Sequence, residues 1–305
     1  MKLYKTPGRQ ISRVLSPLIL LALCSCDPDP DPETGSSGSF ESSPQQYAIT
    51  PGIIDEASGL APGKNLDGFL WTLQDSGAPN SLYLISRDGK EIKEYPVPGT
   101  ANHDWEDMAG GPGPKDGIHY LYIGDIGNNN KPVTLTNIIY RVPEIGITND
   151  SFLQNSVEKI TFSYPDGARD AETLLLDPVT KDLFILSKEI GSTGIYRLPF
   201  PQSTSETMIA EKVGTVPSVS LATGGSISAD GTEILIRTYL SVHYWKRKQD
   251  KTIGQTLSAS ALKQLSVAPE PQGEAICFDR ESAGFYTLSE KSNSSGVSLN
   301  YYKRK

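Results

Sequence analysis

Apolar and polar positions follow a repeating pattern along most of this chain. Five times, a short stretch that begins with a polar residue is followed by a turn and then by an apolar strand of six or seven residues with a polar end. The stretches begin at Glu56, Glu106, Glu172, Ser226 and Glu274, and the strands cover 69–75, 120–125, 183–188, 233–238 and 284–290. Successive stretches are 50, 66, 54 and 48 residues apart. Short strands that repeat about every 50 residues predict an all-β chain folded as a β-propeller, with one four-stranded blade per repeat.

The number of blades follows from the number of repeats. The prediction is five blades, and six is the alternative if residues 126–164 contain a further one. The last repeat supplies only three strands, ending with 298–302, before the final residue Lys305. We therefore expect an N-terminal strand within 46–52 to complete the last blade, because such closure removes an exposed sheet edge.

Residues 1–25 have the features of a bacterial lipoprotein signal peptide. Basic residues precede an apolar stretch over 14–23 that is too short to cross a bilayer as a helix. The basic residues are Lys2, Lys5, Arg9 and Arg13. The stretch ends Leu23-Cys-Ser-Cys26, which resembles a lipobox and predicts lipidation of Cys26; an ordinary signal peptide is the alternative. We expect a lipid anchor in the bacterial outer membrane, with the domain on the periplasmic or the cell-surface face.

The next segment, 26–45, is predicted to be a tether. Asp and Pro alternate over 27–33, and Gly and Ser follow, a composition that favours extended and flexible chain. The propeller is expected to occupy 46–305 as one domain and to be a monomer. If Cys26 is the lipidated first residue, Cys277 is the one thiol left, so no disulfide is expected within the mature chain.

Charge excludes one class of partner. Without the four basic residues of the signal segment, the chain has 24 Lys and Arg against 36 Asp and Glu, a net charge of −12. A surplus of this sign argues against nucleic acid as a partner. It does not argue against cations.

Propeller topology predicts where the chemistry lies. The start of each innermost strand and the end of the next strand lie on the same face, so polar residues there should converge on one rim of the central channel. Acids crowded at a rim persist when they bind a cation, pair with bases or share protons. Oxygen ligands of this kind suit Ca²⁺ or Mg²⁺ rather than Zn²⁺. The predicted metal ligands are Glu56, Glu106, Glu172 and Glu274, and the other rim residues are Asp75, His103, Asp104, Asp107, Asp170 and Glu290.

Three further residues are candidates for catalysis. Asp125 could activate water, while Lys188 and Arg237 could hold an anionic substrate beside a metal. The alternative is that the acids cap backbone amides or bind water, and that the two bases neutralise them. The fourth repeat departs from the pattern, because Gly225-Ser226 replaces the acid. Trp105 is expected near the rim.

Several of these motifs resemble a group of secreted bacterial β-propeller lipoproteins, largely uncharacterised. The motifs are Glu56-Ala-Ser-Gly59, Asn102-His-Asp-Trp-Glu-Asp107, Tyr122-Ile-Gly-Asp-Ile-Gly-Asn128, Asp170-Ala-Glu-Thr173 and Gln272-Gly-Glu-Ala-Ile276. The pairing of Gly273-Glu-Ala-Ile276 with Leu288-Ser-Glu290 is also similar to the phytase-like, esterase-associated propeller domain. That resemblance implies a metal-dependent phosphoester or ester hydrolase.

Two functions stay open from the sequence. One is hydrolysis of a small anionic ester that depends on Ca²⁺ or Mg²⁺. The other is a non-catalytic surface propeller that binds a glycan or a protein partner through the same rim.

Overall fold

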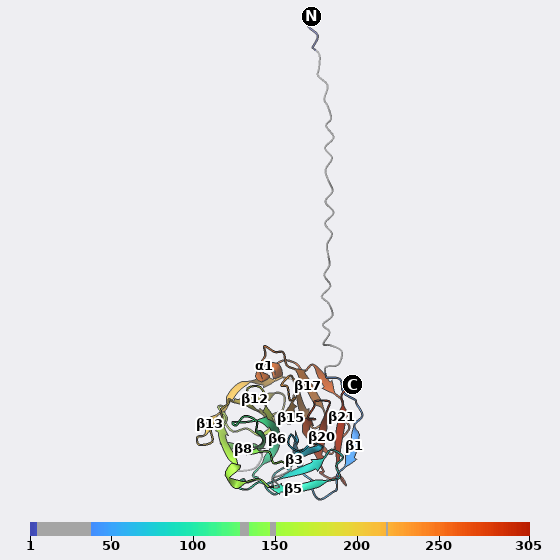
Figure 1. The fold of residues 1–305 in the computed structure, drawn as a ribbon. Helices are drawn as coiled ribbons and strands as arrows, with labels where there is room; N and C mark the ends of the chain where they lie inside the picture. Colours follow the sequence, from blue (N-terminus) through green and yellow to red (C-terminus); the bar gives the residue numbers. More distant parts are fainter. Residues whose placement is uncertain (5–37, 129–133, 147–150, 218) are drawn as a thin grey trace. The chain divides into compact units, whose positions relative to one another are not determined.

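The computed structural model describes residues 1–4, 38–128, 134–146, 151–217 and 219–305. Ser36–Lys305 form one compact unit. Its strands form five separate sheets arranged around a common centre (Figure 1). The prediction of a five-bladed β-propeller is therefore confirmed, and the alternative of a sixth blade within 126–164 is wrong. Among the described residues, no helix is both long and apolar enough to cross a membrane.

Each blade runs from an innermost strand near the channel to an outermost strand. The first comprises β2 (Ala57–Pro62), β3 (Phe69–Gln74), β4 (Ser81–Ser86) and β5 (Ile92–Pro96). The second comprises β6 (Trp105–Pro112), β7 (His119–Asp125), β8 (Asn137–Pro143) and β9 (Glu158–Ser163). The third comprises β10 (Ala171–Leu176), β11 (Leu183–Ser187), β12 (Thr193–Leu198) and β14 (Glu211–Val216). The fourth comprises β15 (Ala222–Ile227), β16 (Glu233–Thr238), β17 (Val242–Lys246) and β18 (Lys263–Leu265).

The fifth blade combines both ends of the compact unit. It contains β19 (Gln272–Phe278), β20 (Gly284–Glu290) and β21 (Ser298–Lys303), and its outermost strand is β1 (Gln45–Ala48), antiparallel to β21. Before β1, Phe40 bridges to Arg304 and stacks edge-on against Phe285, with ring centroids 5.0 Å apart. The predicted closure by an N-terminal strand is confirmed, and it leaves β21 paired on both sides.

Five apolar cores lie between neighbouring blades, one for each interface. They arise because successive side chains of a strand point to opposite faces. In β16, for example, Ile234 and Ile236 pack towards the third blade, whereas Leu235 packs towards the fifth. Trp105 begins β6 next to the predicted rim acids, but its side chain belongs to the core between the first two blades and is fully buried.

Three smaller elements have no counterpart in the predicted pattern. A short strand, β13 (Met208–Ile209), adds to the second blade parallel to β9. A 3-10 turn covers Gln154–Ser156. One helical turn, α1 (Ile253–Leu257), starts at a capping box in which the Thr252 side chain accepts a hydrogen bond from the Gln255 backbone amide. All three lie in connections away from the innermost strands.

Candidate functional site

A β-bulge interrupts every innermost strand at the same level of the channel. In each blade, two consecutive residues of the second strand pair with two residues of the innermost strand that are separated by one extra residue. The extra residues are Ser58, Glu106, Glu172, Thr223 and Glu274. All five are buried. Bulges redirect a side chain locally, and here five of them form one ring, which we call the bulge ring.

The bulge ring corrects the sequence alignment in two blades. In the first blade the ring position belongs to Ser58, and Glu56 is exposed two residues earlier. In the fourth blade it belongs to Thr223, and Ser226 lies three residues further along the strand. Both hydroxyls donate to a carbonyl of the next blade: Ser58 to Glu106, and Thr223 to Gly273 at 3.0 Å. Glu56 is therefore not aligned with the other three predicted metal ligands.

Three carboxylates converge beside the ring. One oxygen from each of Asp75, Asp104 and Glu106 can be chosen so that all three lie within 4.8 Å of one another. Glu106 is only 2% exposed, and its Oε1 has no hydrogen-bond partner among the described residues. Both carboxylate oxygens of Asp104 are also buried without such a partner. Buried carboxylate oxygens without donors are costly unless something else satisfies them. We call these three residues the acid triad.

A glycine makes room for the acid triad. An ideal Cβ on Gly127 would lie within 2.6 Å of the Asp104 carboxylate and closer still to Glu106 Oε1. The Gly127 amide donates to the Asp104 carbonyl at 3.2 Å, which fixes the loop against the triad. Only glycine fits here, because the two carboxylates pack directly against its backbone.

Neighbouring residues hold the acid triad in position. Asp125 accepts from the Asp104 amide at 2.8 Å with one oxygen and contacts His103 Nδ1 at 2.9 Å with the other. Both oxygens are thus engaged, so Asp125 supports Asp104. Asp170 accepts from the Asn128 amide at 2.8 Å, next to Gly127. Asn129 and Asn130, which follow Asp125 closely in the sequence and are also candidate oxygen ligands, lie outside the described residues.

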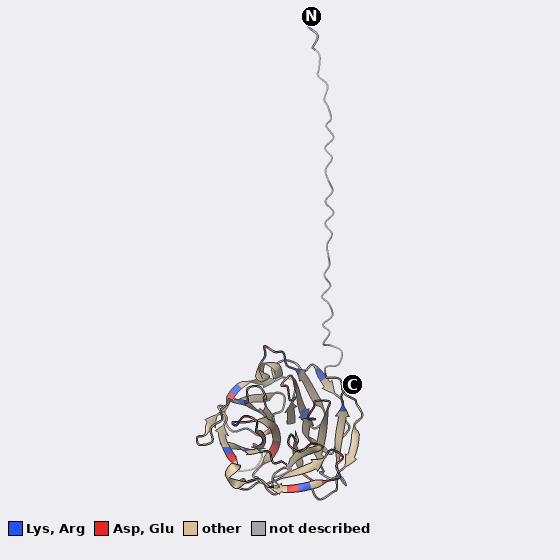
Figure 2. Ribbon diagram, viewed as in Figure 1, with Lys and Arg blue, Asp and Glu red and all other residues tan. Residues whose placement is uncertain are grey.

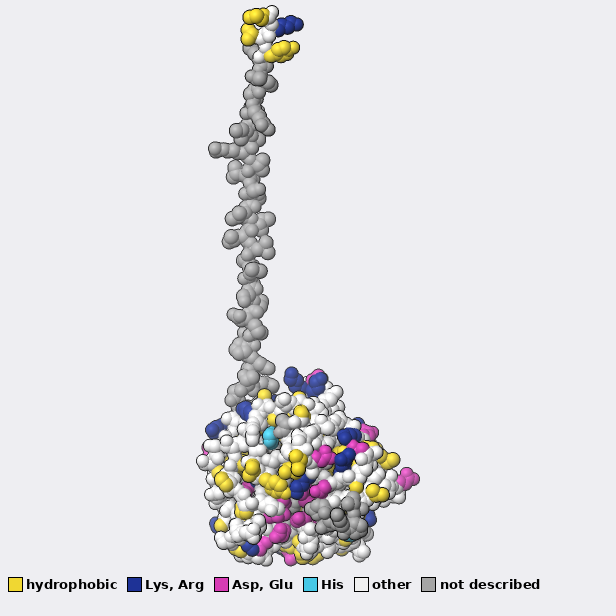
Figure 3. Space-filling view, turned by 180° about the vertical axis from the view of Figure 1, so that it is seen from behind, with side chains coloured by type: hydrophobic (Ala, Val, Ile, Leu, Met, Phe, Trp, Pro, Cys, Tyr) yellow, Lys and Arg dark blue, Asp and Glu magenta, His cyan; other side chains and the backbone are white. Residues whose placement is uncertain are grey.

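The other two ring glutamates have partners of their own. Glu172 forms an ion pair with Lys188, whose ammonium also lies 5.2 Å from the Tyr239 ring centroid. Glu274 and Glu290 share the Gln272 side-chain amide as donor, at 3.1 and 2.6 Å. Figure 2 marks the acidic and basic positions along the ribbon, and Figure 3 shows Asp and Glu side chains gathered at the lower centre of one face, with basic and hydrophobic side chains beside them.

Arg237 is not presented to solvent as an anion clamp. It is 1% exposed, pairs with Glu270 and donates to the Ala275 carbonyl at 3.1 Å. Thr287 and Asn300 also donate to Glu270. This network joins the fourth and fifth blades, so the structure gives Arg237 a structural setting that differs from its predicted catalytic role.

Asp107 blocks the channel below the acid triad. Its Oδ2 accepts from the amides of Leu174 at 2.9 Å and Gly225 at 3.3 Å, and its Oδ1 accepts from Met108 at 2.8 Å. Gly225 lies on β15, which is not the neighbour of β6 in the ring, so this bond crosses the channel. Asp107 is completely buried. It connects three blades and is a channel plug rather than the rim residue that was predicted.

Crowding raises the pKa values of the acids. Burial and the charges of Asp75 and Asp170 raise the pKa of Asp104 to about 6. Burial, followed by repulsion from Glu172 and Asp75, raises the pKa of Glu106 well above its usual range. Burial also raises the pKa of Glu274 and Glu290. The Glu172 carboxylate keeps Lys188 charged by raising its pKa, although burial opposes this.

These shifts predict how stability depends on pH when no divalent cation is present. A carboxyl whose pKa is raised on folding binds protons more tightly in the native state, so its contribution is present at low pH and is lost as pH rises through the native pKa. We expect the melting temperature to fall between about pH 4 and pH 6, where the unfolded chain has lost the Asp104 proton and the native chain still holds it. Thermal melts in chelator-treated buffers would measure this, and a rising melting temperature over that range would contradict it.

Several residues of the site were not found from the sequence. Ser58 and Thr223 were hidden because hydroxyls occupy positions where other blades have Glu. Gln272 and Gly127 lie inside motifs that were recognised only for their acids. Their distance from the acids along the sequence could have identified them, because Gly127 follows Asp125 by two residues and Gln272 precedes Glu274 by two.

The fold and the site together define a five-bladed β-propeller with an acidic end to a blocked channel. No protein family model matches the chain, and no curated protein matches it. Among solved structures, the hydrazine synthase of Kuenenia stuttgartiensis is similar over 82% of this chain and 83% of that chain, with 10% sequence identity and a TM-score of 0.41. A similarity at this level says nothing about what this chain binds. The resemblance to phytase-like propellers and to lipoproteins stays a prediction.

Proposed function

We propose that this chain is a lipid-anchored β-propeller that binds a divalent cation, Ca²⁺ in preference to Mg²⁺, through the acid triad of Asp75, Asp104 and Glu106. The observation that carries the proposal is the buried Glu106 Oε1 without a hydrogen-bond partner among the described residues, grouped with the equally unpartnered Asp104 carboxylate and with Asp75. A cation there offsets the repulsion between the carboxylates. Anchoring through Cys26 in the outer membrane belongs to the same proposal, and fatty-acid labelling that persists in Cys26→Ser would refute it.

The ligand type and the packing of the triad support Ca²⁺ over Mg²⁺. One oxygen from each carboxylate can be chosen so that all three lie within 4.8 Å of one another, which is close enough for one ion to contact all three. Ca²⁺ accepts irregular arrangements of oxygen ligands, whereas Mg²⁺ demands near-octahedral geometry and usually keeps several waters. Three crowded, mostly buried protein carboxylates are therefore expected to favour Ca²⁺.

Calorimetric titration of the purified propeller tests this proposal. We expect one Ca²⁺ per chain, with Mg²⁺ at least tenfold weaker, and loss of the Ca²⁺ heat in Asp104→Asn. Glu206→Gln is the matched control, because it also removes one negative charge but lies on an exposed loop. Unchanged Ca²⁺ binding in Asp104→Asn would show that the acid triad is not the Ca²⁺ site.

The same end of the channel supports two uses of the cation. Hydrolysis of a phosphoester or carboxylic ester would use the cation as a Lewis acid and Lys188 to hold the anion. Lys188 lies close enough to Asp75 to lower its pKa, although burial dominates and the net shift is upward. Its pairing with Glu172 weighs against turnover, because an incoming anion must displace that carboxylate.

A non-catalytic binding role for a glycan or protein has its own support. Ile190 and Leu240, on loops that leave β11 and β16 at the acidic end, are each 89% exposed. A contiguous exposed apolar patch with a polar rim is typical of an interaction surface, and this proposal requires the two side chains to belong to one. Chelator-sensitive hydrolysis of aryl phosphates or aryl esters that is lost in Lys188→Gln would favour the enzyme. Its absence, with Ca²⁺ binding intact, would favour the binding module.

A further inference from the structure

Lys188 places a positive charge inside the acidic end of the channel. It directly follows β11, its side chain is only 18% exposed, and its ammonium forms an ion pair with Glu172 of the bulge ring. Its backbone amide donates to the Asp170 carbonyl at 2.9 Å, and the Tyr239 ring centroid lies 5.2 Å from the ammonium. Residues of the third and fourth blades therefore hold the lysine in place.

The ion pair engages only half of the Glu172 carboxylate. Oε1 accepts from Lys188, whereas Oε2 is buried and has no hydrogen-bond partner among the described residues. Burial is the main cause of the raised pKa of Glu106, and the charge of Glu172 is the next. The Lys188 ammonium is thus bound to the carboxylate whose charge acts most strongly on this member of the acid triad.

The charge of Lys188 also reaches other acids at this end. Burial raises the pKa of both Asp75 and Glu274, and the positive charge of Lys188 opposes the rise in each. Asp75 belongs to the acid triad. A cation bound at the triad and the Lys188 ammonium would therefore act on the same carboxylate, and the two positive charges would repel each other.

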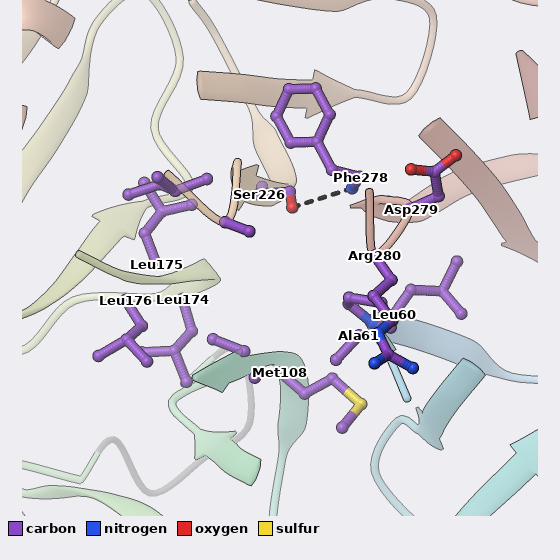
Figure 4. A pocket seen from close by; sticks show the side chains of 16 residues that line it. Leu60, Ala61, Met108, Leu174, Leu175, Leu176, Ser226, Phe278, Asp279 and Arg280 are labelled. Atoms are coloured by element: carbon purple, nitrogen blue, oxygen red, sulfur yellow. Dashed lines mark hydrogen bonds between the residues drawn. The ribbon is translucent and has the colours of Figure 1, made fainter. Parts of the chain in front are cut away.

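The channel plug closes the acidic end from below. Along β6, Glu106 in the bulge ring is followed by Asp107, the plug, and then by Met108, which lines a pocket of about 70 Å³ on the far side (Figure 4). All five innermost strands contribute to that pocket. Because the plug separates solvent in the pocket from the acid triad, charges beside the triad are screened less than charges on an open surface.

We propose that Lys188 is a built-in counter-cation that sets the affinity and the charge selectivity of the acid triad for metal ions. Such a role rests on the proposed cation site at Asp75, Asp104 and Glu106. Without a metal ion, the ammonium offsets part of the crowded negative charge. With a metal ion bound, the same ammonium repels it. Lys188 therefore stabilises the empty site and weakens cation binding.

Calorimetric titration of Ca²⁺ into Lys188→Met tests this role. Methionine keeps a flexible side chain beside Tyr239 and removes the charge, so we expect the variant to bind Ca²⁺ at least tenfold more tightly than the parent. Lys188→Arg keeps the charge and should stay within about threefold of the parent. Lys188→Gln, whose amide can still donate to Glu172, should show the same gain as Lys188→Met and replaces it if that variant does not fold.

Lys291→Met is the matched control. Lys291 directly follows β20 and forms an ion pair of the same kind, with Asp55 at 2.7 Å, and its side chain is 29% exposed. Asp55 does not belong to the acid triad. Removing this lysine also makes the chain more negative by one charge, but the Ca²⁺ affinity should change by less than about threefold.

A second ion separates charge repulsion from a change of shape. La³⁺ resembles Ca²⁺ in size and in its preference for oxygen ligands, but repulsion by Lys188 weakens its binding more because its charge is larger. We expect Lys188→Met to tighten La³⁺ by a larger factor than Ca²⁺. Equal factors would indicate a rearranged site and would overturn the role of the lysine charge.

The titrations distinguish a failure of this role from a failure of the cation site. If the parent and Lys188→Met bind Ca²⁺ equally while Asp104→Asn loses binding, the cation site stands and Lys188 does not tune it. If neither the parent nor Lys188→Met binds Ca²⁺, the cation site is refuted and the role of Lys188 with it.

Discussion

Asp107→Ala is expected to lower the free energy of unfolding by about 3–5 kcal/mol, measured by urea denaturation. The substitution removes the acceptor for the buried amides of Leu174 and Gly225, which belong to two other blades. Each buried amide left without a partner costs about 1–3 kcal/mol. A cavity on the channel axis adds to that cost.

The control for this variant is Asp250→Ala, which removes an exposed carboxylate and should change stability by less than about 0.5 kcal/mol. If both variants lose the same small amount, Asp107 is not a plug. The crossing bond makes a further distinction possible. Because Gly225 lies across the channel from β6, loss of this bond should speed hydrogen exchange in the middle of β15 as well as within β6.

Strand positions were predictable because the propeller buries both faces of its inner strands. In β16, three consecutive apolar residues pack into two different cores, and a run of that kind has few other interpretations in a short repeat. The N-terminal closure was predictable by counting, since the last repeat lacked one strand. These inferences use local pattern and chain length only.

The site was less predictable because bulges decide which residue enters the channel. An alignment by residue type selects Glu56 for the first blade, but the extra residue of that bulge is Ser58. A shift of one or two residues moves a side chain to another face or out of the strand. Residue type is therefore a poor guide to register where the innermost strands are irregular.

Long-range charge pairing was also invisible in the sequence pattern. Arg237 ends a strand in the fourth blade, and its partner Glu270 lies between two prolines in the connection to the fifth. Nothing in the local composition relates them. Two bases assigned to substrate binding thus differ: Lys188 lies at the acidic end of the channel and Arg237 is buried in an inter-blade network.

Glu106→Gln is expected to reverse the order of stability between the parent and the variant when Ca²⁺ is added. Without cation, the parent must either bury the charged Glu106 carboxylate, which burial and then repulsion from Glu172 and Asp75 disfavour, or hold a proton on it, and the neutral amide of nearly the same shape avoids both costs. We expect the variant to melt about 2–4 °C higher in chelator-treated buffer, equivalent to about 1 kcal/mol.

Ca²⁺ should then act on the parent alone. A ligand present at about a hundred times its Kd stabilises the native state by about 2.7 kcal/mol, which exceeds the expected advantage of the variant. Differential scanning calorimetry with and without Ca²⁺ measures both halves of the prediction, and Glu206→Gln should behave like the parent in each. A variant that is less stable than the parent without cation would mean that the Glu106 carboxylate is satisfied within the protein. In that case Glu106 has no need of a cation, and the observation that carries the proposed site is lost.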